Sequence, residues 1–201
     1  RLQNATKKVI EFKKDVPSKL CRSLFYGKVD AAVISSIESR IKKYKKISMG
    51  VVAKDRVISV LVRKNSARKL DPASMSSNML SLILNLKGEV IIGDRALKCY
   101  LNEGRDKFYD LGEIWHKKYN LPFVFAKFCC IKNGDFYTGL VKKFLKQKVK
   151  IPQYILAEYA KSRGITKKDI TWYLNFISYK IGAKEEKAFK IFIKKARKLN
   201  F

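Results

Sequence analysis

The sequence predicts an α/β protein of two lobes, joined by a two-strand hinge and ending in a helical C-terminal third. Strand-like apolar runs alternate with helical periodicity in the first two thirds of the chain. Two similar hydrophobic strands, 57–63 and 123–130, frame about sixty residues, a length that fits a small inserted lobe. The chain would leave the first lobe by one strand and return by the other, which places a cleft between the lobes.

The first elements alternate between helix and strand. Pro17 suits the first turn of a helix, and Gly27 suits its end. A buried strand follows over 29–34, and a helical stretch begins at Ile37. This alternation is typical of a largely parallel sheet, to which 49–53 adds a further strand.

The middle segment combines two helices with a short strand. Turn and cap residues over 70–78 lead into an apolar helix over 79–86. The strand 89–92 comes next, and a second helix starts within 110–115. The segment therefore has the content of a small α/β lobe.

The last third of the chain reads as helical. Apolar residues recur at helical spacing over 136–145, 170–177 and 189–196. Thr166 and Asp169 have the spacing of a capping box at the start of the second of these stretches.

The charge is strongly positive, with 45 Lys+Arg against 17 Asp+Glu and a net charge of +28. Hydrophobic residues make up 47%, enough for a real core, so we exclude a disordered polycation. Lysine rather than arginine dominates, and many lysines sit between apolar residues as on solvated helix faces. The charge alone leaves two kinds of partner open, a polyanion or an anionic small molecule; with the family resemblance given below, we expect a small-molecule dicarboxylate and no specific nucleic acid. No apolar run reaches the roughly 18–20 residues of a membrane span, so we expect no membrane insertion.

The cysteines and the single histidine do not form a metal-binding pattern. No CxxC motif joins Cys21, Cys99, Cys129 and Cys130, so we expect no metal site. Cys129 and Cys130 close an apolar run and are expected in the core. We expect His116, which precedes two lysines, to be a surface residue.

Polar residues gather where the helix of the middle segment begins. Ser74, Ser76, Ser77 and Asn78 lie at its start, where free backbone N–H groups favour a carboxylate or phosphate. Plain N-capping needs only one of them. Anion binding and capping therefore both remain open for this segment.

Four further residues are candidates for contacts with a ligand. Ser35 and Ser36 follow a strand at its carboxyl end, where α/β sheets bind ligands, although either could also be a cap. Asp94 has the same kind of position after 89–92. Glu113 lies near a helix start, and its spacing alone assigns it no role. The chain contains no dinucleotide or Walker-type glycine motif.

Several stretches carry a more specific signal. Residues 109–115 read Y-D-L-G-E-I-W and residues 121–126 read L-P-F-V-F-A, a combination that is hard to obtain by chance. Residues 29–38, 74–77 and 91–97 add a strand–helix entry, a serine-rich helix start and an I-I-G-D-R-A-L stretch. Together they resemble the menaquinone-biosynthesis family that contains chorismate dehydratase.

The resemblance implies the type II periplasmic-binding-protein-like fold. Lobe I would comprise 1–66 plus 126–201, and lobe II would comprise 67–125. Family members open with a strand and a G-x-[IV]-x-Y-x-N-x-x-P-like motif that supplies an asparagine. Nothing like it precedes Val9, so we expect the chain to lack that strand.

The resemblance also implies an activity and a compartment. It points to a cytoplasmic carbon–oxygen lyase that converts chorismate to 3-[(1-carboxyvinyl)oxy]benzoate and water in the futalosine route to menaquinone. Aromatisation drives the reaction, so no cofactor is expected. The D-L-G-E-x-W form favours this dehydratase over the sister enzyme that acts on cyclic dehypoxanthine futalosine. Two further functions stay open, a non-catalytic solute-binding protein and a basic nucleic-acid-binding protein.

The resemblance assigns expected roles to the candidate residues. The two carboxylates of chorismate suit two anion sites in a basic cleft. Ser76 and Ser77, with Asn78 beside them, would hold one carboxylate. Ser35 or Ser36 would contact the other end of the substrate. Glu113 would transfer the proton or contact the leaving hydroxyl, and Asp94 would be a supporting contact.

Overall fold

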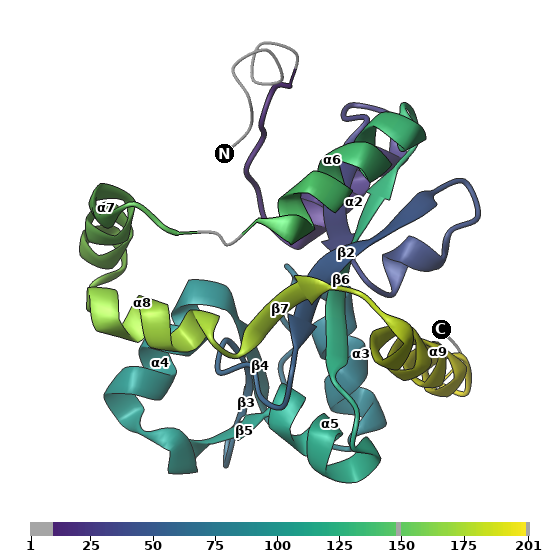
Figure 1. Ribbon diagram of the computed structural model, residues 1–201. Helices are drawn as coiled ribbons and strands as arrows, with labels where there is room; N and C mark the ends of the chain where they lie inside the picture. The colour runs from purple at the N-terminus through teal and green to yellow at the C-terminus, as the bar shows by residue number, and fades with distance from the viewer. Residues whose placement is uncertain (1–9, 148–149, 200–201) are drawn as a thin grey trace.

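The computed structural model describes residues 10–147 and 150–199, which form two antiparallel sheets with helices around them (Figure 1). The expected absence of the family's first strand concerns residues before Val9, which lie outside the described residues. In Figure 1 the four-stranded sheet runs through the upper and central part of the molecule, and the three-stranded sheet lies below it.

The four-stranded sheet has the order β1-β6-β2-β7. Its strands are β1 (Ala31–Ser35), β6 (Phe123–Cys130), β2 (Lys45–Ala53) and β7 (Ile177–Lys180). All three neighbouring pairs are antiparallel, so the expectation of a largely parallel sheet was wrong. β1 and β2 themselves run in the same direction, since each is antiparallel to β6. However, β6 returns from the other sheet, runs the opposite way and separates them.

The three-stranded sheet has the order β4-β3-β5, again with antiparallel pairs. Its strands are β4 (Glu89–Ile92), β3 (Val60–Arg63) and β5 (Phe108–Asp110). The expected strand 57–63 therefore belongs to this sheet as β3, whereas β6 pairs with β1 and β2 of the other sheet. Residues 54–59 connect β2 to β3, and α5 followed by residues 120–122 connects β5 back to β6. The lobe boundaries, 1–66 plus 126–201 and 67–125, stay a prediction.

Helices cover both sheets. The longer ones are α2 (Pro17–Phe25), α3 (Met75–Ile83), α4 (Gly93–Glu103), α5 (Leu111–Tyr119), α6 (Gly134–Lys146), α7 (Gln153–Arg163), α8 (Lys167–Leu174) and α9 (Ala183–Arg197). Two 3₁₀ turns, η1 (Glu38–Arg40) and η2 (Arg105–Lys107), complete the set. The predicted start and end of α2 are confirmed, since Pro17 opens it and Gly27 follows it at φ +70°.

Two expected helical stretches differ from the structure. The helix expected from Ile37 is only the turn η1, because Ile37 and Tyr44 are both buried and the chain enters β2 at Lys45. The helix expected from the apolar spacing over 170–177 ends at Leu174, and Ile177 is the first residue of β7, where it pairs with Ala53. Pairing with a neighbouring strand overrides the helical spacing here. The capping box of Thr166 and Asp169 is confirmed.

An aromatic cluster joins the helices to the four-stranded sheet. The ring centroids of Trp115 and Phe123 lie 5.1 Å apart, and those of Phe123 and Phe192 lie 4.9 Å apart. Trp115 also donates a hydrogen bond from Nε1 to the carbonyl of Pro122 at 3.1 Å. α5, β6 and α9 are thereby packed around one core.

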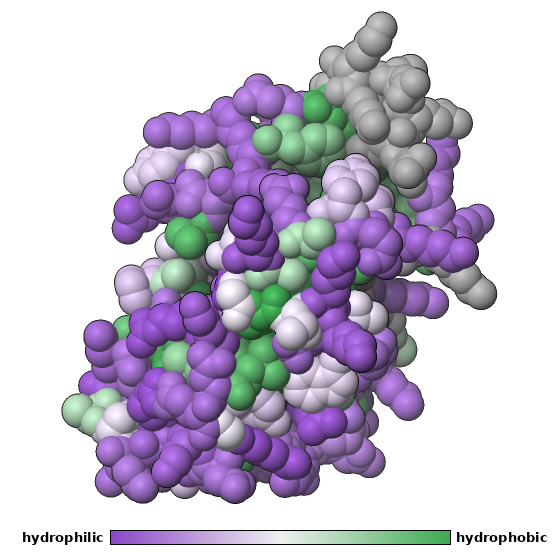
Figure 2. Space-filling view, turned by 90° about the vertical axis from the view of Figure 1, so that its left-hand side faces the viewer, coloured by the Kyte–Doolittle hydropathy of each residue, from purple (hydrophilic) through white to green (hydrophobic). Residues whose placement is uncertain are grey.

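The surface is largely hydrophilic, with an apolar patch in the middle of the face that Figure 2 shows. One lysine departs from the expected solvated coat. Lys127 is buried on β6, where its Nζ lies 2.6 Å from Glu186 Oε1 and 4.4 Å from the ring centroid of Phe189. Within residues 10–147 and 150–199, no helix is both long and apolar enough to cross a membrane.

The expectations for cysteine and histidine had mixed outcomes. Cys129 and Cys130 are buried in the core, as predicted. His116 is half-buried, with Nδ1 enclosed and without a hydrogen-bond partner among the described residues, so the surface assignment was wrong. It lies on α5 directly after Trp115, whose burial draws that side of the helix inward.

Candidate functional site

The carboxyl end of β1 meets the first turn of α3 in a cluster of serines. Ser76 Oγ lies 2.7 Å from Ser35 Oγ and 3.0 Å from Ser36 Oγ. The backbone N–H of Ser76 donates to Ser35 Oγ at 3.0 Å, and that of Ile37 donates to Ser76 Oγ at 3.1 Å. The structure therefore brings together two of the segments that the sequence singled out. We call Ser35, Ser36 and Ser76 the serine cluster.

The serine cluster is buried and its polar atoms are paired with one another. Ser36 and Ser76 are 0% exposed, and Ser35 is 3% exposed. A hydroxyl has one donor hydrogen and two acceptor sites, and Ser76 Oγ uses all of them with three partners. To donate to a carboxylate, a hydroxyl of the cluster would have to turn from its present partner and the buried cluster would have to open to the ligand. It contains no titratable side chain and cannot remove a proton.

Local sequence explains why α3 begins beside the serine cluster. Ser74 is the N-cap, and its Oγ accepts the N–H of Ser77 at 3.3 Å while lying 2.8 Å from Ser77 Oγ. Asn78 turns away toward the preceding loop. Its amide accepts from Asp71 N at 2.9 Å and donates to Asp71 O at 2.7 Å. Ser77 thus stays at the helix start, whereas Asn78 stabilises the loop.

Glu113 and Asp94 are each held by basic side chains away from the serine cluster. Glu113 Oε1 lies 2.7 Å from Arg105 Nη2 and 2.7 Å from Lys117 Nζ. Partial burial opposes ionisation, but the hydrogen bond from Lys117 and the charge of Arg105 lower the pKa of Glu113 overall. Asp94 Oδ2 lies 2.7 Å from Arg163 Nε, with its side chain 61% exposed. No hydrogen bond among the described residues joins either carboxylate to a clustered serine.

A buried carboxylate that the sequence pattern did not single out lies at the crossing between the sheets. Asp110, at the end of β5, accepts N–H hydrogen bonds from Val57 at 3.1 Å, Ile58 at 2.7 Å and Glu113 at 3.1 Å. Burial raises its pKa, although the three N–H donors act in the opposite direction. The D-L-G-E stretch contains this residue, but spacing gives no hint that it spans two segments more than fifty residues apart.

Ser59 and Tyr173 were also missed. Ser59 Oγ lies 3.0 Å from Tyr173 OH, and the carbonyl of Ser59 accepts the N–H of Gly93 at 2.7 Å. The local sequence predicts Ser59 to be a strand residue and Tyr173 to be one of a row of apolar and aromatic residues along a helix. A contact between side chains so distant in sequence leaves no signal in the local pattern.

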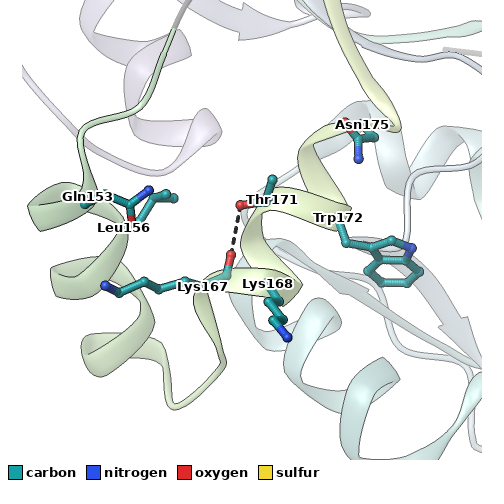
Figure 3. Close-up of a pocket in the computed structure, with 7 residues that line it drawn as sticks. All are labelled: Gln153, Leu156, Lys167, Lys168, Thr171, Trp172 and Asn175. Atoms are coloured by element: carbon teal, nitrogen blue, oxygen red, sulfur yellow. Dashed lines mark hydrogen bonds between the residues drawn. The ribbon is translucent and has the colours of Figure 1, made fainter.

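The open grooves lie elsewhere on the surface. One of about 480 Å³ lies between α7 and α8 (Figure 3), lined by Gln153, Leu156, Lys167, Lys168, Thr171, Trp172 and Asn175. A second of about 450 Å³ includes Asp94 and Arg163. Neither groove contains a clustered serine. Within the described parts of the chain, no three His, Cys, Asp or Glu side chains gather as a metal site would require.

Comparison with known proteins identifies the family. The family model described as menaquinone biosynthesis matches residues 71–198. A chorismate dehydratase from Campylobacter jejuni subsp. jejuni serotype O:23/36 (strain 81-176) is 50% identical over 200 residues, which is 99% of this chain and 89% of that relative. The chain belongs to the menaquinone-biosynthesis family. The resemblance seen in the motifs is thereby confirmed.

Solved structures place this menaquinone-biosynthesis protein in a fold class. Protein AF1704 from Archaeoglobus fulgidus superposes with a TM-score of 0.66 at 17% identity, covering 98% of this chain and 91% of that one. The periplasmic aliphatic sulphonate binding protein SsuA from Escherichia coli gives 0.55 at 16% identity, covering 92% and 79%. The predicted α/β fold of the periplasmic-binding-protein type is therefore confirmed.

Proposed function

We propose that this family member is a chorismate dehydratase. The observation that carries the proposal is 50% identity to the Campylobacter enzyme over 99% of the chain. The proposed reaction converts chorismate to 3-[(1-carboxyvinyl)oxy]benzoate and water, as a cytoplasmic carbon–oxygen lyase in the futalosine route. The energy comes from forming an aromatic ring, so the proposed mechanism uses no cofactor.

The serine cluster supports binding of a carboxylate. Ser35 and Ser36 from β1 converge on Ser76 in the first turn of α3. A helix start favours negative charge, and hydroxyl and N–H donors bind carboxylates well. In this proposal Ser76 and Ser77 hold one carboxylate of chorismate. Ser35 and Ser36 lie within hydrogen-bond distance of Ser76, so we place them at that same end rather than at the other end of the substrate, as the resemblance implied. Asn78 contributes by fixing the loop before α3 through both of its bonds to Asp71.

Dehydration removes a ring proton and the neighbouring hydroxyl. The electrons of the broken C–H bond form the new ring double bond while the C–O bond breaks and hydroxide departs. Glu113 is the proposed partner for the proton or the hydroxyl, and Asp94 the supporting contact. The lowered pKa of Glu113 makes it a weaker base than an ordinary glutamate, so in this proposal the substrate displaces Lys117 or Arg105 from its carboxylate before the proton is transferred.

The two sheets supply the proposed lobes. We infer that the lobes meet across 54–59 and 120–122, the segments that connect the sheets. These crossings differ slightly from the expected boundaries at 66/67 and 125/126, because β3 pairs with β4 and β5. Closure of the lobes would exclude water from the bound substrate.

The test is direct incubation of the protein with chorismate, followed by mass spectrometry of the products. We expect a new aromatic product lighter than chorismate by one water. Cyclic dehypoxanthine futalosine is offered in a parallel reaction. Turnover of that compound alone would assign the sister activity, and binding without any product would indicate a solute-binding protein.

A further inference from the structure

The connection between the sheets is held in one unusual conformation. Ile58 has φ +60°, which a β-branched residue rarely adopts, and the N–H of Ser59 donates to the carbonyl of Val57 at 2.6 Å. Asp110 accepts the N–H groups of Val57 and Ile58. Gly112 packs so closely that a Cβ there would lie 3.1 Å from Val57 N. Strained backbone of this kind persists where the surroundings fix it, and it is concentrated at functional sites.

The strained turn fixes Ser59 between two helices. Its carbonyl accepts the N–H of Gly93, the first residue of α4, at 2.7 Å. Its hydroxyl lies 3.0 Å from Tyr173 OH on α8. Ser59 is 6% exposed, so neither bond competes freely with water. One small residue therefore connects the crossing segment, α4 and α8.

Helix α8 has few other attachments to the three-stranded sheet and the helices that cover it. It contains no fully buried residue. Trp172 lies 6.4 Å from Tyr100 of α4 between ring centroids, and Tyr173 packs at the edge of the main core. After α8 the chain returns to the four-stranded sheet as β7, beside β2. Lys54 and Arg56 of the crossing segment also hold the residues directly after α8, by hydrogen bonds from Lys54 to the carbonyls of Asn175 at 2.9 Å and Phe176 at 3.1 Å and by the Arg56 guanidinium 4.3 Å from the Phe176 ring centroid. The Ser59–Tyr173 hydrogen bond is the buried contact made from within α8 itself, an element with few buried apolar contacts, so we expect it to affect the position of the helix.

We propose that Ser59 and Tyr173 are positioning residues for the dehydratase reaction, whose mutual hydrogen bond holds α8 against the crossing segment and the start of α4. The proposal rests on the proposed function for its link to catalysis. By spanning the two sheets at their connection, the pair stabilises the arrangement in which both sheets face one substrate. It acts on binding of the substrate rather than on the bond-breaking step.

The test uses three variants: Tyr173→Phe, Ser59→Ala and the double variant that carries both changes. Each is compared with the control variant Tyr154→Phe. The control removes the same hydroxyl from a tyrosine on α7 that is 71% exposed. Hydrogen exchange is followed on the amides of α8, with α9 as an internal reference. Loss of one hydrogen bond should raise exchange on α8 about fivefold and leave α9 unchanged. In steady-state assays KM for chorismate should rise by about the same factor while kcat changes less than about twofold.

The double variant separates a pair from two independent effects. If the two hydroxyls act together, the double variant should behave as either single variant does. Additive effects, or α8 exchange in Tyr173→Phe equal to that of Tyr154→Phe, would overturn the proposal. A fall in kcat with unchanged KM would also overturn it. Failure of the wild-type protein to convert chorismate would remove the proposed function, while the exchange comparison would still report on the pair.

Discussion

At the scale of single residues, the two kinds of candidate side chain have separate surroundings. The serine cluster is buried, uncharged and internally hydrogen-bonded, whereas Glu113 and Asp94 are held by arginine and lysine side chains. This separation matches a division between binding and proton transfer. Binding and proton transfer can each be tested by a substitution that removes a single functional group.

The first prediction concerns Glu113. Glu113→Gln keeps the size of the side chain and removes its ability to accept a proton. We expect kcat for chorismate to fall by about 10²-fold or more, the usual contribution of a positioned acid or base. Glu158→Gln, on an exposed face of α7, serves as the control and should retain the wild-type rate. A wild-type rate in Glu113→Gln would remove Glu113 from the mechanism.

The second prediction concerns Ser76. Ser76→Ala leaves the buried N–H of Ile37 without its acceptor at 3.1 Å and deprives Ser35 and Ser36 of a partner. We expect the free energy of unfolding to fall by about 1–3 kcal/mol, measured by urea titration, together with a higher KM for chorismate. Ser162→Ala, at an exposed position on α7, should change neither. Unaltered KM in a folded Ser76→Ala protein would contradict carboxylate binding by the cluster.

At the scale of helices and strands, the local sequence predicts where an element begins and ends better than it predicts which strands pair with each other. The strands 89–92 and 123–130 and the capping box at Thr166 follow from the sequence, because apolar runs and cap residues act within a few positions. The end of α8 and the start of β7 do not. Ile177 continues the helical spacing, and only pairing with Ala53 makes it a strand residue. The three-residue strand β5 is too short for any pattern to reveal.

The third prediction uses two glycines inside helices. A Cβ at Gly112 in α5 would lie 3.1 Å from Val57 N and 3.2 Å from Ala53 Cβ, whereas a Cβ at Gly139 in α6 would meet nothing within 4 Å. Gly112→Ala should therefore lower the free energy of unfolding by about 1–3 kcal/mol through overpacking. Gly139→Ala should raise it by up to about 1 kcal/mol, because alanine favours helix. Equal effects in thermal or urea unfolding would show that α5 does not pack closely on the crossing segment.

The fourth prediction concerns the pH dependence of the second sheet. A hydrogen bond from Arg95, with the nearby charges of Arg95, Lys69 and Arg63, lowers the pKa of Glu89 on β4. For an acid with a lowered folded pKa, the added stability is present above the unfolded value of about 4.3 and is lost as pH falls through the folded value. Glu89→Gln should therefore be less stable than wild type at neutral pH, and this difference should shrink on acidification. The control Glu158→Gln should have the same free energy of unfolding as wild type across the pH range. If the difference between Glu89→Gln and wild type stayed constant with pH, the stabilising role given to the ionised Glu89 would be contradicted.

At the scale of the whole molecule, charge and topology act differently. The net charge of +28 sets a positive field without determining the fold. Family membership and the α/β fold class follow from motifs and strand ends that the sequence displays, whereas the direct contact of Ser35 with Ser76 was not predicted. The antiparallel order of the sheets, the burial of Lys127 and the contact of Ser59 with Tyr173 arise from long-range packing. Single-sequence periodicity carries no information on such pairings.

The fifth prediction follows from the positive electrostatic field of the protein. Chorismate carries two negative charges, so kcat/KM should fall severalfold as potassium chloride is raised from low to high concentration, while kcat at saturation stays constant. Neutral sucrose at matched viscosity is the control. Any binding to DNA or RNA should be non-specific and should disappear at moderate salt. Sequence-preferring binding that survives moderate salt would favour a nucleic-acid-binding function.

The central place of β6 has a consequence for biosynthesis. Its two neighbours, β1 and β2, are made long before it, and among the described strands β1 pairs with β6 alone while the other partner of β2 is β7. In a nascent chain that has not yet emerged past Cys130, β1 and β2 both lack the sheet partners that they have in the folded protein. Unpaired strand edges attract other chains, so we expect the unfinished polypeptide to aggregate more readily than the complete one until its central strand has been made.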